Sequence, residues 1–427
     1  MKGDLVEMKK VHLTREVFVA GGTPVATYNP RQGQRIEVMV RQYLSERGKA
    51  LTIHGASKSG KTVLVERLAP AGSALWLHGQ DINDVADFWT QLGTRLGIAN
   101  SRTSGAERET SLDTKFGMAA HIGSLADGSW QRTDGERDKK SESATVPQHA
   151  ADAVREHLAS SHATIVVDDF HFIPDAAKRA IARAIKTLIA NSPVILIAVP
   201  SEAFEVVRTE PNMEGRVWSL PIPAWNADEL SAIGSEGFPL LNLVDPGGSV
   251  ARKLAECSYG SPFLMQQLCH DLVRWELGVE ETLGSPLALA PPVDFDRFLA
   301  GCADRMVPSI FPRLLAGPNP KGTERAPIRL KEGGISTDIY GTVLVAIRNL
   351  VPPMTLLERD VSTEVQRVTS TNVVRGRVTS ALNQMNTIAF ERRGDSDPVI
   401  RLRDQQLYIQ DAILTFYLRH GSWSPAK

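Results

Sequence analysis

The chain has 427 residues, of which 42% are hydrophobic and 23% are charged. This ordinary globular mixture excludes a wholly disordered or collagen-like chain, and the length allows about three domains. The 48 Lys and Arg residues balance the 49 Asp and Glu residues to a formal net charge of -1, whereas a protein that coats nucleic acid is usually strongly basic.

After a leader over residues 1–33, strand and helix patterns alternate through residues 34–225. The strands are rich in Val and Ile, are apolar on both faces and are separated by helices, which predicts a parallel sheet covered on both sides. An insert over residues 100–145, rich in Ser, Thr, Gly and charge, interrupts the pattern. The expected strands are residues 50–54, 74–78, 164–167, 194–199 and 217–220, and the expected helices are residues 34–46, 62–69, 85–96, 149–160 and 176–189.

The second half of the chain is mainly helical in pattern. Residues 226–306 are expected to form a helical lid, and the Pro, Gly and Lys of residues 307–334 predict a linker. In residues 335–427, helix patterns at 338–349, 356–365 and 372–385 come before a predicted hairpin with strands at 389–393 and 399–403. A last helix is expected over residues 405–418. Three helices followed by a hairpin is the order of a winged helix, a helix-turn-helix variant.

A glycine-rich loop joins the first predicted strand to the next helix. Residues 55–62, GASKSGKT, match the phosphate-binding pattern GxxxxGK[ST] at every fixed position and in the required strand–loop–helix context. Glycines allow backbone N–H groups to turn inward around a phosphate, and the helix N-terminus adds a positive dipole end. Lys61 is expected to reach the β- and γ-phosphates, and Thr62 to complete a Mg²⁺ shell. The expected nucleotide-binding residues are Gly55, Ala56, Ser57, Lys58, Ser59, Gly60, Lys61, Thr62 and Val63.

Two adjacent acids follow the predicted strand at residues 164–167. Asp168 is expected to hold Mg²⁺ directly or through water, and Asp169 to orient or deprotonate the attacking water. Two carboxylates leaving a buried strand are costly unless a cation neutralises them. The expected fold class is therefore α/β, a parallel-sheet P-loop NTPase core with a helical lid and a C-terminal winged-helix domain. The chain has no NKxD motif for guanine, so ATP is the expected nucleotide.

These motifs and the helices after them resemble the AAA+/STAND group of P-loop ATPases over roughly residues 27–275. The Asp168-Asp169 pair is more similar to the STAND branch than to the Asp-Glu of most AAA+ motors. The resemblance implies that Tyr28 lies beside the adenine and that Pro262, in a Gly-Ser-Pro element of the lid, packs near the nucleotide. A surface turn is the alternative for Tyr28. No arginine follows at the usual second-sensor position of the lid.

The same resemblance implies two further catalytic residues. Ser201 is the nearest match to a polar sensor after the strand at 194–199. Arg216 has the position of an arginine finger that would complete the site of a neighbouring subunit, with Arg208 as a weaker match. An arginine in a local ion pair is the alternative for Arg216.

The predicted winged helix has two uses in this group, DNA binding or docking on the nucleotide domain. Residues 335–427 carry a small excess of basic residues, but acids lie among them, so both uses stay open. The residues considered for DNA are Asn372, Arg375 and Arg377 on the recognition helix and Arg392, Arg393, Arg401 and Arg403 in the wing, with Asp395, Asp397 and Asp404 between them.

The hypothesis is a slow ATPase that acts as a conformational switch and controls self-assembly and signalling to a protein partner. Bacterial defence is suggested by family analogy only. One alternative is a DNA-binding ATPase, such as an origin, transposition or partition loader, and another is a scaffold that binds ATP without hydrolysing it. No apolar run approaches the ~20 residues of a membrane span, there is no signal-peptide pattern, and the cysteines are sparse. We therefore expect a cytoplasmic protein without a membrane partner.

Overall fold

The computed structural model describes residues 10–98, 151–199, 210–319, 325–391 and 398–426. The chain divides into two compact units. We call Glu37–His54 with Leu64–Pro221 the sheet unit, and Met1–Ile36, Gly55–Val63 and Ile222–Lys427 the helical unit, each within its described residues. The phosphate-binding loop therefore belongs to the helical unit, although it directly follows a strand of the sheet unit.

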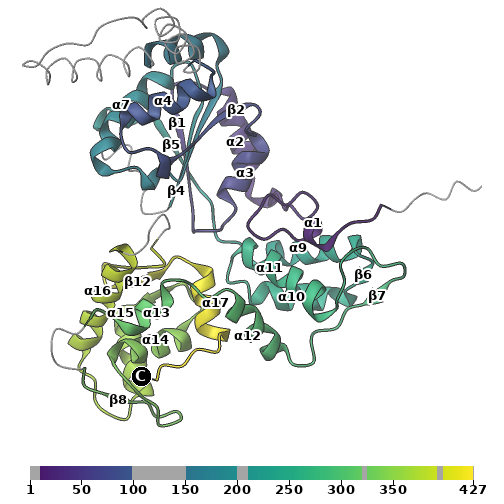
Figure 1. Cartoon of the computed structure of the whole chain (residues 1–427), viewed down its shortest axis with the longest axis vertical. Helices are drawn as coiled ribbons and strands as arrows, with labels where there is room; N and C mark the ends of the chain where they lie inside the picture. Colours follow the sequence, from purple (N-terminus) through teal and green to yellow (C-terminus); the bar gives the residue numbers. More distant parts are fainter. Residues whose placement is uncertain (1–9, 99–150, 200–209, 320–324, 392–397, 427) are drawn as a thin grey trace, which may run out of the picture. The chain divides into compact units, whose positions relative to one another are not determined.

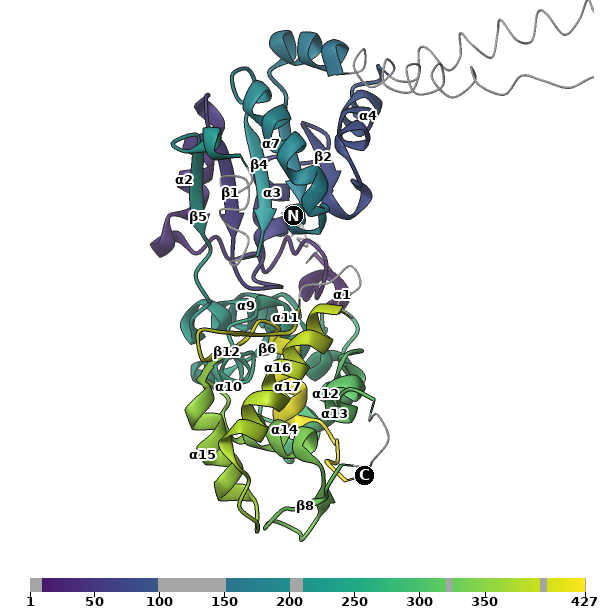
Figure 2. The same cartoon turned by 90° about the vertical axis from the view of Figure 1, so that its left-hand side faces the viewer.

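The sheet unit contains a five-stranded parallel sheet with the strand order β2-β3-β4-β1-β5. Figure 2 shows β5, β1 and β4 next to one another in this order. The five expected strands are confirmed, with small shifts at their ends. They are β1 (Ala50–His54), β2 (Ala74–His78), β3 (Thr164–Asp168), β4 (Val194–Ala198) and β5 (Val217–Pro221).

Both faces of this sheet are buried, as its apolar strands require. On one face, Ile165 and Val167 of β3 join a core with α4 (Val85–Arg95) and α7 (Asp175–Leu188). Val166 between them is also fully buried but points to the opposite face. This unit also contains α2 (Ile36–Ser45) and α3 (Lys61–Leu68), which begin with residues that belong to the helical unit, and residues 151–161 are helical where a helix was expected over 149–160.

The helical unit contains the lid helices and the C-terminal helices in one continuous apolar core. Tyr259, in the turn before the lid helix that begins at Pro262, shows how they meet, because its ring packs edge-on against that of Phe416 with 6.4 Å between the ring centres. Figure 1 shows these helices in green and yellow. The lid helices are α9 (Ala227–Leu240), α10 (Ser249–Glu256), α11 (Pro262–Asp271) and α12 (Phe295–Arg305). The C-terminal helices are α13 (Phe311–Ala316), α14 (Ile339–Leu350), α15 (Glu358–Val368), α16 (Arg375–Glu391) and α17 (Ala412–His420).

The C-terminal domain has the expected winged-helix order. Helices α14, α15 and α16 come before a hairpin of β11 (Ile400–Arg403) and β12 (Gln406–Ile409). A short strand, β10 (Thr355–Leu357), pairs with β12 to complete a three-stranded sheet.

The strand expected at residues 389–393 is wrong, because α16 continues to Glu391. Met385 and Ala389, four residues apart, are both buried, which is helical spacing and not strand alternation. The hairpin lies further along the chain, and its second strand covers residues predicted to begin the last helix. Asp404 and Gln405 both have positive φ, at 50° and 61°, as a two-residue type I′ turn requires.

Residues 307–334, expected to be a linker, contain α13 and the short strand β8 (Ile328–Arg329). Phe311 and Leu314 of α13 are buried in the shared core.

Among the described residues, none of the helices combines the length and apolar character that crossing a bilayer requires. Cys257, Cys269 and Cys302 are free thiols.

Candidate nucleotide-binding site

The loop between β1 and α3 has a backbone that only some residues tolerate. Gly60 has a φ of 90° and Lys58 a φ of 59°, so two positions of the loop lie in the left-handed region. A Cβ on Gly55 would lie 2.9 Å from the Ile222 carbonyl oxygen and 3.2 Å from Ser59 Oγ. The glycines at positions 55 and 60 are therefore required by close approach and by φ, respectively, as the motif predicts.

The motif lysine folds back over its own loop. Lys61 Nζ donates to the carbonyl oxygens of Gly55 and Ala56, each at 2.9 Å, and the residue is 9% exposed. The ammonium group is thus held at the loop by backbone acceptors. Thr62 follows in the first turn of α3 and is half-buried.

The acid pair stands at the carboxyl edge of the sheet. Asp168 is the last residue of β3 and is 6% exposed, and its Oδ1 accepts the backbone N–H of Asp169 at 3.0 Å. Asp169 has a φ of 54°, so the chain turns sharply directly after the strand. Strand β4 lies between β1 and β3. Since all three are parallel, Asp168 ends at the edge from which the chain leaves β1 for the loop.

Gly79, directly after β2, is a residue of this site that the sequence reasoning missed. A Cβ on Gly79 would lie 2.2 Å from the Asp169 carbonyl oxygen and 3.3 Å from that of Asp168. The backbone of the acid pair can pass here only because position 79 has no side chain. In the sequence, the one signal for this role is that a glycine comes immediately after a predicted strand.

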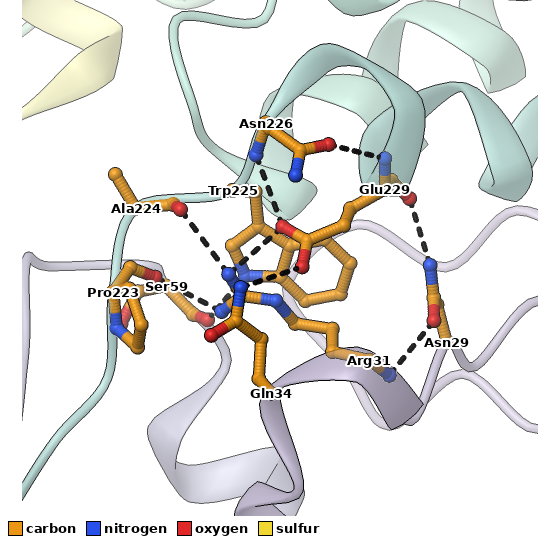
Figure 3. A network of polar contacts seen from close by, with 9 residues as sticks. All are labelled: Asn29, Arg31, Gln34, Ser59, Pro223, Ala224, Trp225, Asn226 and Glu229. Atoms are coloured by element: carbon orange, nitrogen blue, oxygen red, sulfur yellow. Dashed lines mark hydrogen bonds and ion pairs between the residues drawn. The ribbon is translucent and has the colours of Figure 1, made fainter.

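Arg31, in the segment expected to flank adenine, is itself buried and is the centre of a polar network (Figure 3). Its guanidinium donates to the carbonyl oxygens of Pro223 at 2.9 Å and Ala224 at 3.1 Å, and to Glu229 Oε2 at 2.8 Å. It also lies 4.7 Å from the centre of the Trp225 ring. Arg31 thereby connects the N-terminal segment to the start of α9.

Glu229 has a second role as a helix cap. Its carboxylate accepts the backbone N–H of Asn226 at 3.0 Å, while Asn226 Oδ1 accepts the N–H of Glu229 at 2.8 Å, which forms a capping box. Burial acts to raise the pKa of Glu229, but the hydrogen bonds from Arg31 and Asn226 outweigh it and hold the pKa below its ordinary value. Glu229 is therefore a carboxylate at neutral pH.

Two elements from later in the chain reach the loop. Lys58 Nζ forms an ion pair with Asp411 Oδ2 at 3.1 Å, and Asp411 caps α17 by accepting the N–H of Ile413 at 2.7 Å. Pro262 begins α11, and its Cγ lies 4.0 Å from the position that a Cβ on Gly60 would take. The loop thus has contacts with both the lid and the C-terminal domain inside the helical unit.

The other predicted site residues are less closely tied to the loop. Tyr28 is half-buried, and its place beside adenine stays a prediction. Arg216 is exposed and directly precedes β5, where its carbonyl oxygen accepts the N–H of Ala50 at 2.8 Å. Ser201 and Arg208 lie outside the described residues, as does the insert over residues 100–145.

No protein-family model and no curated protein matches the chain. Among solved structures, the Walker-type ATPase of Pyrococcus abyssi matches with a TM-score of 0.52 at 12% identity, over 94% of this chain and 99% of that one. The fold is that of a Walker-type P-loop ATPase.

Two further solved structures match with lower TM-scores. The Cdc6p protein of Pyrobaculum aerophilum has a TM-score of 0.41 at 12% identity, over 95% of this chain and 97% of its own. A signal-transduction ATPase with numerous domains and a tetratricopeptide repeat sensor, from Pyrococcus horikoshii, has a TM-score of 0.35 at 12% identity, over 92% of this chain and 42% of its own. At these identities the likeness concerns the fold alone.

Proposed function

We propose that the chain is a Mg-ATP-binding and hydrolysing conformational switch of AAA+/STAND type. The observation that carries this proposal is the position of the loop. The loop carries the motif residues, and its Lys58 forms an ion pair with the residue that caps α17. Pro262 of the lid lies near Gly60, with its Cγ 4.0 Å from the position that a Cβ on Gly60 would take. A ligand at this loop would act directly on two elements that lie far apart in the sequence.

The residues present suit a magnesium nucleotide. The loop has the backbone path that the motif glycines permit, with left-handed geometry at Gly60 and a close approach to Ile222 at Gly55. As the two motifs predict, the Thr62 hydroxyl and the Asp168 carboxylate would supply the hard oxygen ligands that Mg²⁺ prefers. When bound, Mg²⁺ would neutralise charge on the phosphates and on the acid pair. Lys61 would bind the β- and γ-phosphates through its ammonium, and Asp169 would orient the attacking water and take its proton.

The switch step follows from charge. Lys58 is held by Asp411, and a triphosphate at the loop would compete with that carboxylate for the same ammonium. Loss of the ion pair would weaken the contact between the loop and α17.

We propose the exposed side chain of Arg216 as the arginine finger that completes the nucleotide site of a second copy of the chain. A protein partner would then receive the output.

The experiment that tests this function separates binding from hydrolysis. Lys61→Ala should weaken Mg-ATP binding by about 10- to 100-fold, since it removes charge-assisted hydrogen bonds to phosphate. Asp169→Asn should keep the affinity and slow hydrolysis by about 100-fold or more, since it removes the base. Calorimetric titration and phosphate release measure the two effects.

Two results would count against the proposal. A wild-type chain that binds no Mg-ATP would overturn it entirely. If the wild type bound Mg-ATP without hydrolysing it, the ATP-stabilised scaffold would be favoured instead. For that scaffold, Asp169→Asn should leave function unchanged.

A DNA-binding ATPase is the second candidate, and one feature of α16 favours it. This helix has no acidic residue before Glu391, so its exposed face is basic and polar. Arg375 at the start of this helix pairs with Glu358 at 3.7 Å. In the wing, Arg403 pairs with Asp404 at 3.3 Å, and Arg401 lies 5.6 Å from the ring of Phe390. Arg392, Arg393, Asp395 and Asp397 lie outside the described residues. The exposed residues of α16 include Arg375, Arg377, Ser380, Asn383, Gln384 and Thr387.

This candidate predicts salt-dependent binding to duplex DNA through α16. Arg377→Ala should weaken the affinity and lower the slope of log affinity against log salt by about one. Arg252→Ala on the lid helix α10, where the arginine is also exposed, is the matched control. Equal DNA affinity for wild type and Arg377→Ala in a fluorescence anisotropy titration would reject α16 as the DNA-binding element.

A further inference from the structure

Arg31 connects segments of the helical unit that are far apart in the sequence. It is 5% exposed, and its guanidinium holds the Pro223 and Ala224 carbonyl oxygens while pairing with Glu229 (Figure 3). A planar guanidinium donates in fixed directions, so acceptors on three different residues are fixed relative to one another. The chain that runs from Pro223 into α9 is therefore positioned by a residue near the N-terminus.

Trp225 carries this positioning to the phosphate-binding loop. Its indole lies against the Arg31 guanidinium at 4.7 Å, and its Nε1–H donates to the Ser59 carbonyl oxygen at 3.0 Å. The Cζ2 atom of the same ring lies 4.0 Å from the position that a Cβ on Gly60 would take. The ring thus contacts the loop by a hydrogen bond to Ser59 and lies near Gly60.

The hydrogen bond from Trp225 orients one peptide group of the loop. In a trans peptide the carbonyl and the following N–H point in opposite directions. Because the Ser59 carbonyl points to the indole, the N–H of Gly60 points away from it. Converging backbone N–H groups are what a loop of this kind offers to a phosphate, so the orientation of this peptide matters for anion binding.

We propose that Arg31 and Trp225 are positioning residues for the phosphate-binding loop: Arg31 holds the Trp225 indole, and the indole fixes the Ser59–Gly60 peptide with the Gly60 N–H available to a phosphate. This inference rests on the proposed function, because it assigns the loop to a nucleotide phosphate. It adds a specific cause for the loop geometry that lies outside the motif itself.

The test compares the loop in variants that change one contact each, first without nucleotide. Trp225→Phe keeps a ring against Arg31 but removes the indole N–H, and Arg31→Lys keeps the charge but removes the planar fork. Arg41→Lys is the matched control, because Arg41 pairs with Glu37 at an exposed position where its side chain is 62% exposed. Hydrogen exchange of the amides in residues 55–62 should be about 10-fold faster in both variants than in wild type and control, while exchange in α12 stays unchanged.

A second measurement connects the loop to its ligand. Mg-ATP affinity should fall by about 3- to 10-fold in Trp225→Phe, as expected for one lost hydrogen bond. Unchanged exchange of the loop amides in Trp225→Phe would overturn the inference, even if Arg31→Lys failed to fold. Faster exchange with unchanged affinity would also overturn it. If the wild type bound no Mg-ATP, the proposed function would fail, while the exchange data would still decide the role of Trp225 in ordering the loop.

Discussion

At the scale of single residues, Gly79 shows how the acid pair depends on a position without a side chain. A Cβ there would lie 2.2 Å from the carbonyl oxygen of Asp169, which is backbone and cannot move without moving the turn. We expect Gly79→Ala to lower the free energy of unfolding by about 1–3 kcal/mol, as overpacking does. It should reduce ATP hydrolysis more than ATP binding, because the displaced residue is the proposed base.

Gly72→Ala is the control for this prediction, since a Cβ on Gly72 meets nothing within 4 Å and its φ is not positive. That change should be neutral or slightly stabilising. Urea unfolding and phosphate release measure both variants. If Gly79→Ala were as stable and as active as Gly72→Ala, the close approach would have no consequence.

The residues of the loop could be predicted from the sequence because they are contiguous and their chemistry is local. The roles of Arg31 and Gly79 could not be predicted in this way. The acceptors of Arg31 are 192 to 198 residues away along the chain, and no spacing rule relates them. The oxygen that Gly79 must avoid belongs to Asp169, across the insert. Both roles depend on tertiary contacts, which only the structure supplies.

At the scale of elements, a hydrogen bond of 2.8 Å joins Tyr259, in the turn before α11, to His420 at the end of α17. Burial lowers the pKa of His420 to about 4, Arg419 acts in the same direction, and Asp296 opposes it. The imidazole is therefore neutral at pH 7, so its Nε2 can accept the Tyr259 hydroxyl. Tyr259 and His420 form one contact between the lid and the C-terminal domain.

This contact predicts a pH dependence of stability. An unfolded histidine titrates near pH ~6.5, so the unfolded chain binds one more proton than the folded chain as the pH falls from there towards about 4. The free energy of unfolding should therefore fall as the pH falls through this window, by less than ~1.4 kcal/mol per pH unit, since partial exposure screens the effect. His420→Gln should show a shallower fall in urea unfolding series. Identical pH slopes for variant and wild type would contradict this assignment.

The elements themselves were predicted with unequal success. The five strands of the parallel sheet were placed correctly because each is a short apolar run between helices. The first strand of the hairpin was predicted too early in the chain, because the apolar side chains at the start of residues 389–393 resemble a strand. In the structure, Met385 and Ala389 lie on the buried face of α16, which continues to Glu391. Phe311 and Leu314 were missed as core residues because the prolines and glycines around them favour a loop.

At the scale of the whole molecule, the proposed switch depends on one loop that several parts of the helical unit contact. Lys58 is paired with the cap of α17, Ser59 accepts from Trp225, and Pro262 of the lid packs beside Gly60. A ligand that reorganises this loop has differential contacts with each of these elements, which is the physical requirement for a ligand-driven switch.

Hydrogen exchange of α17 in the presence and absence of Mg-ATP tests this claim most directly. Asp169→Asn is the protein to use, because it should hold ATP without turning it over. Saturating Mg-ATP should break the pair between Lys58 and Asp411, and the amides of Ala412–His420 should then exchange about 10-fold faster than without nucleotide. Bound Mg-ATP with unchanged exchange throughout α17 would contradict the account.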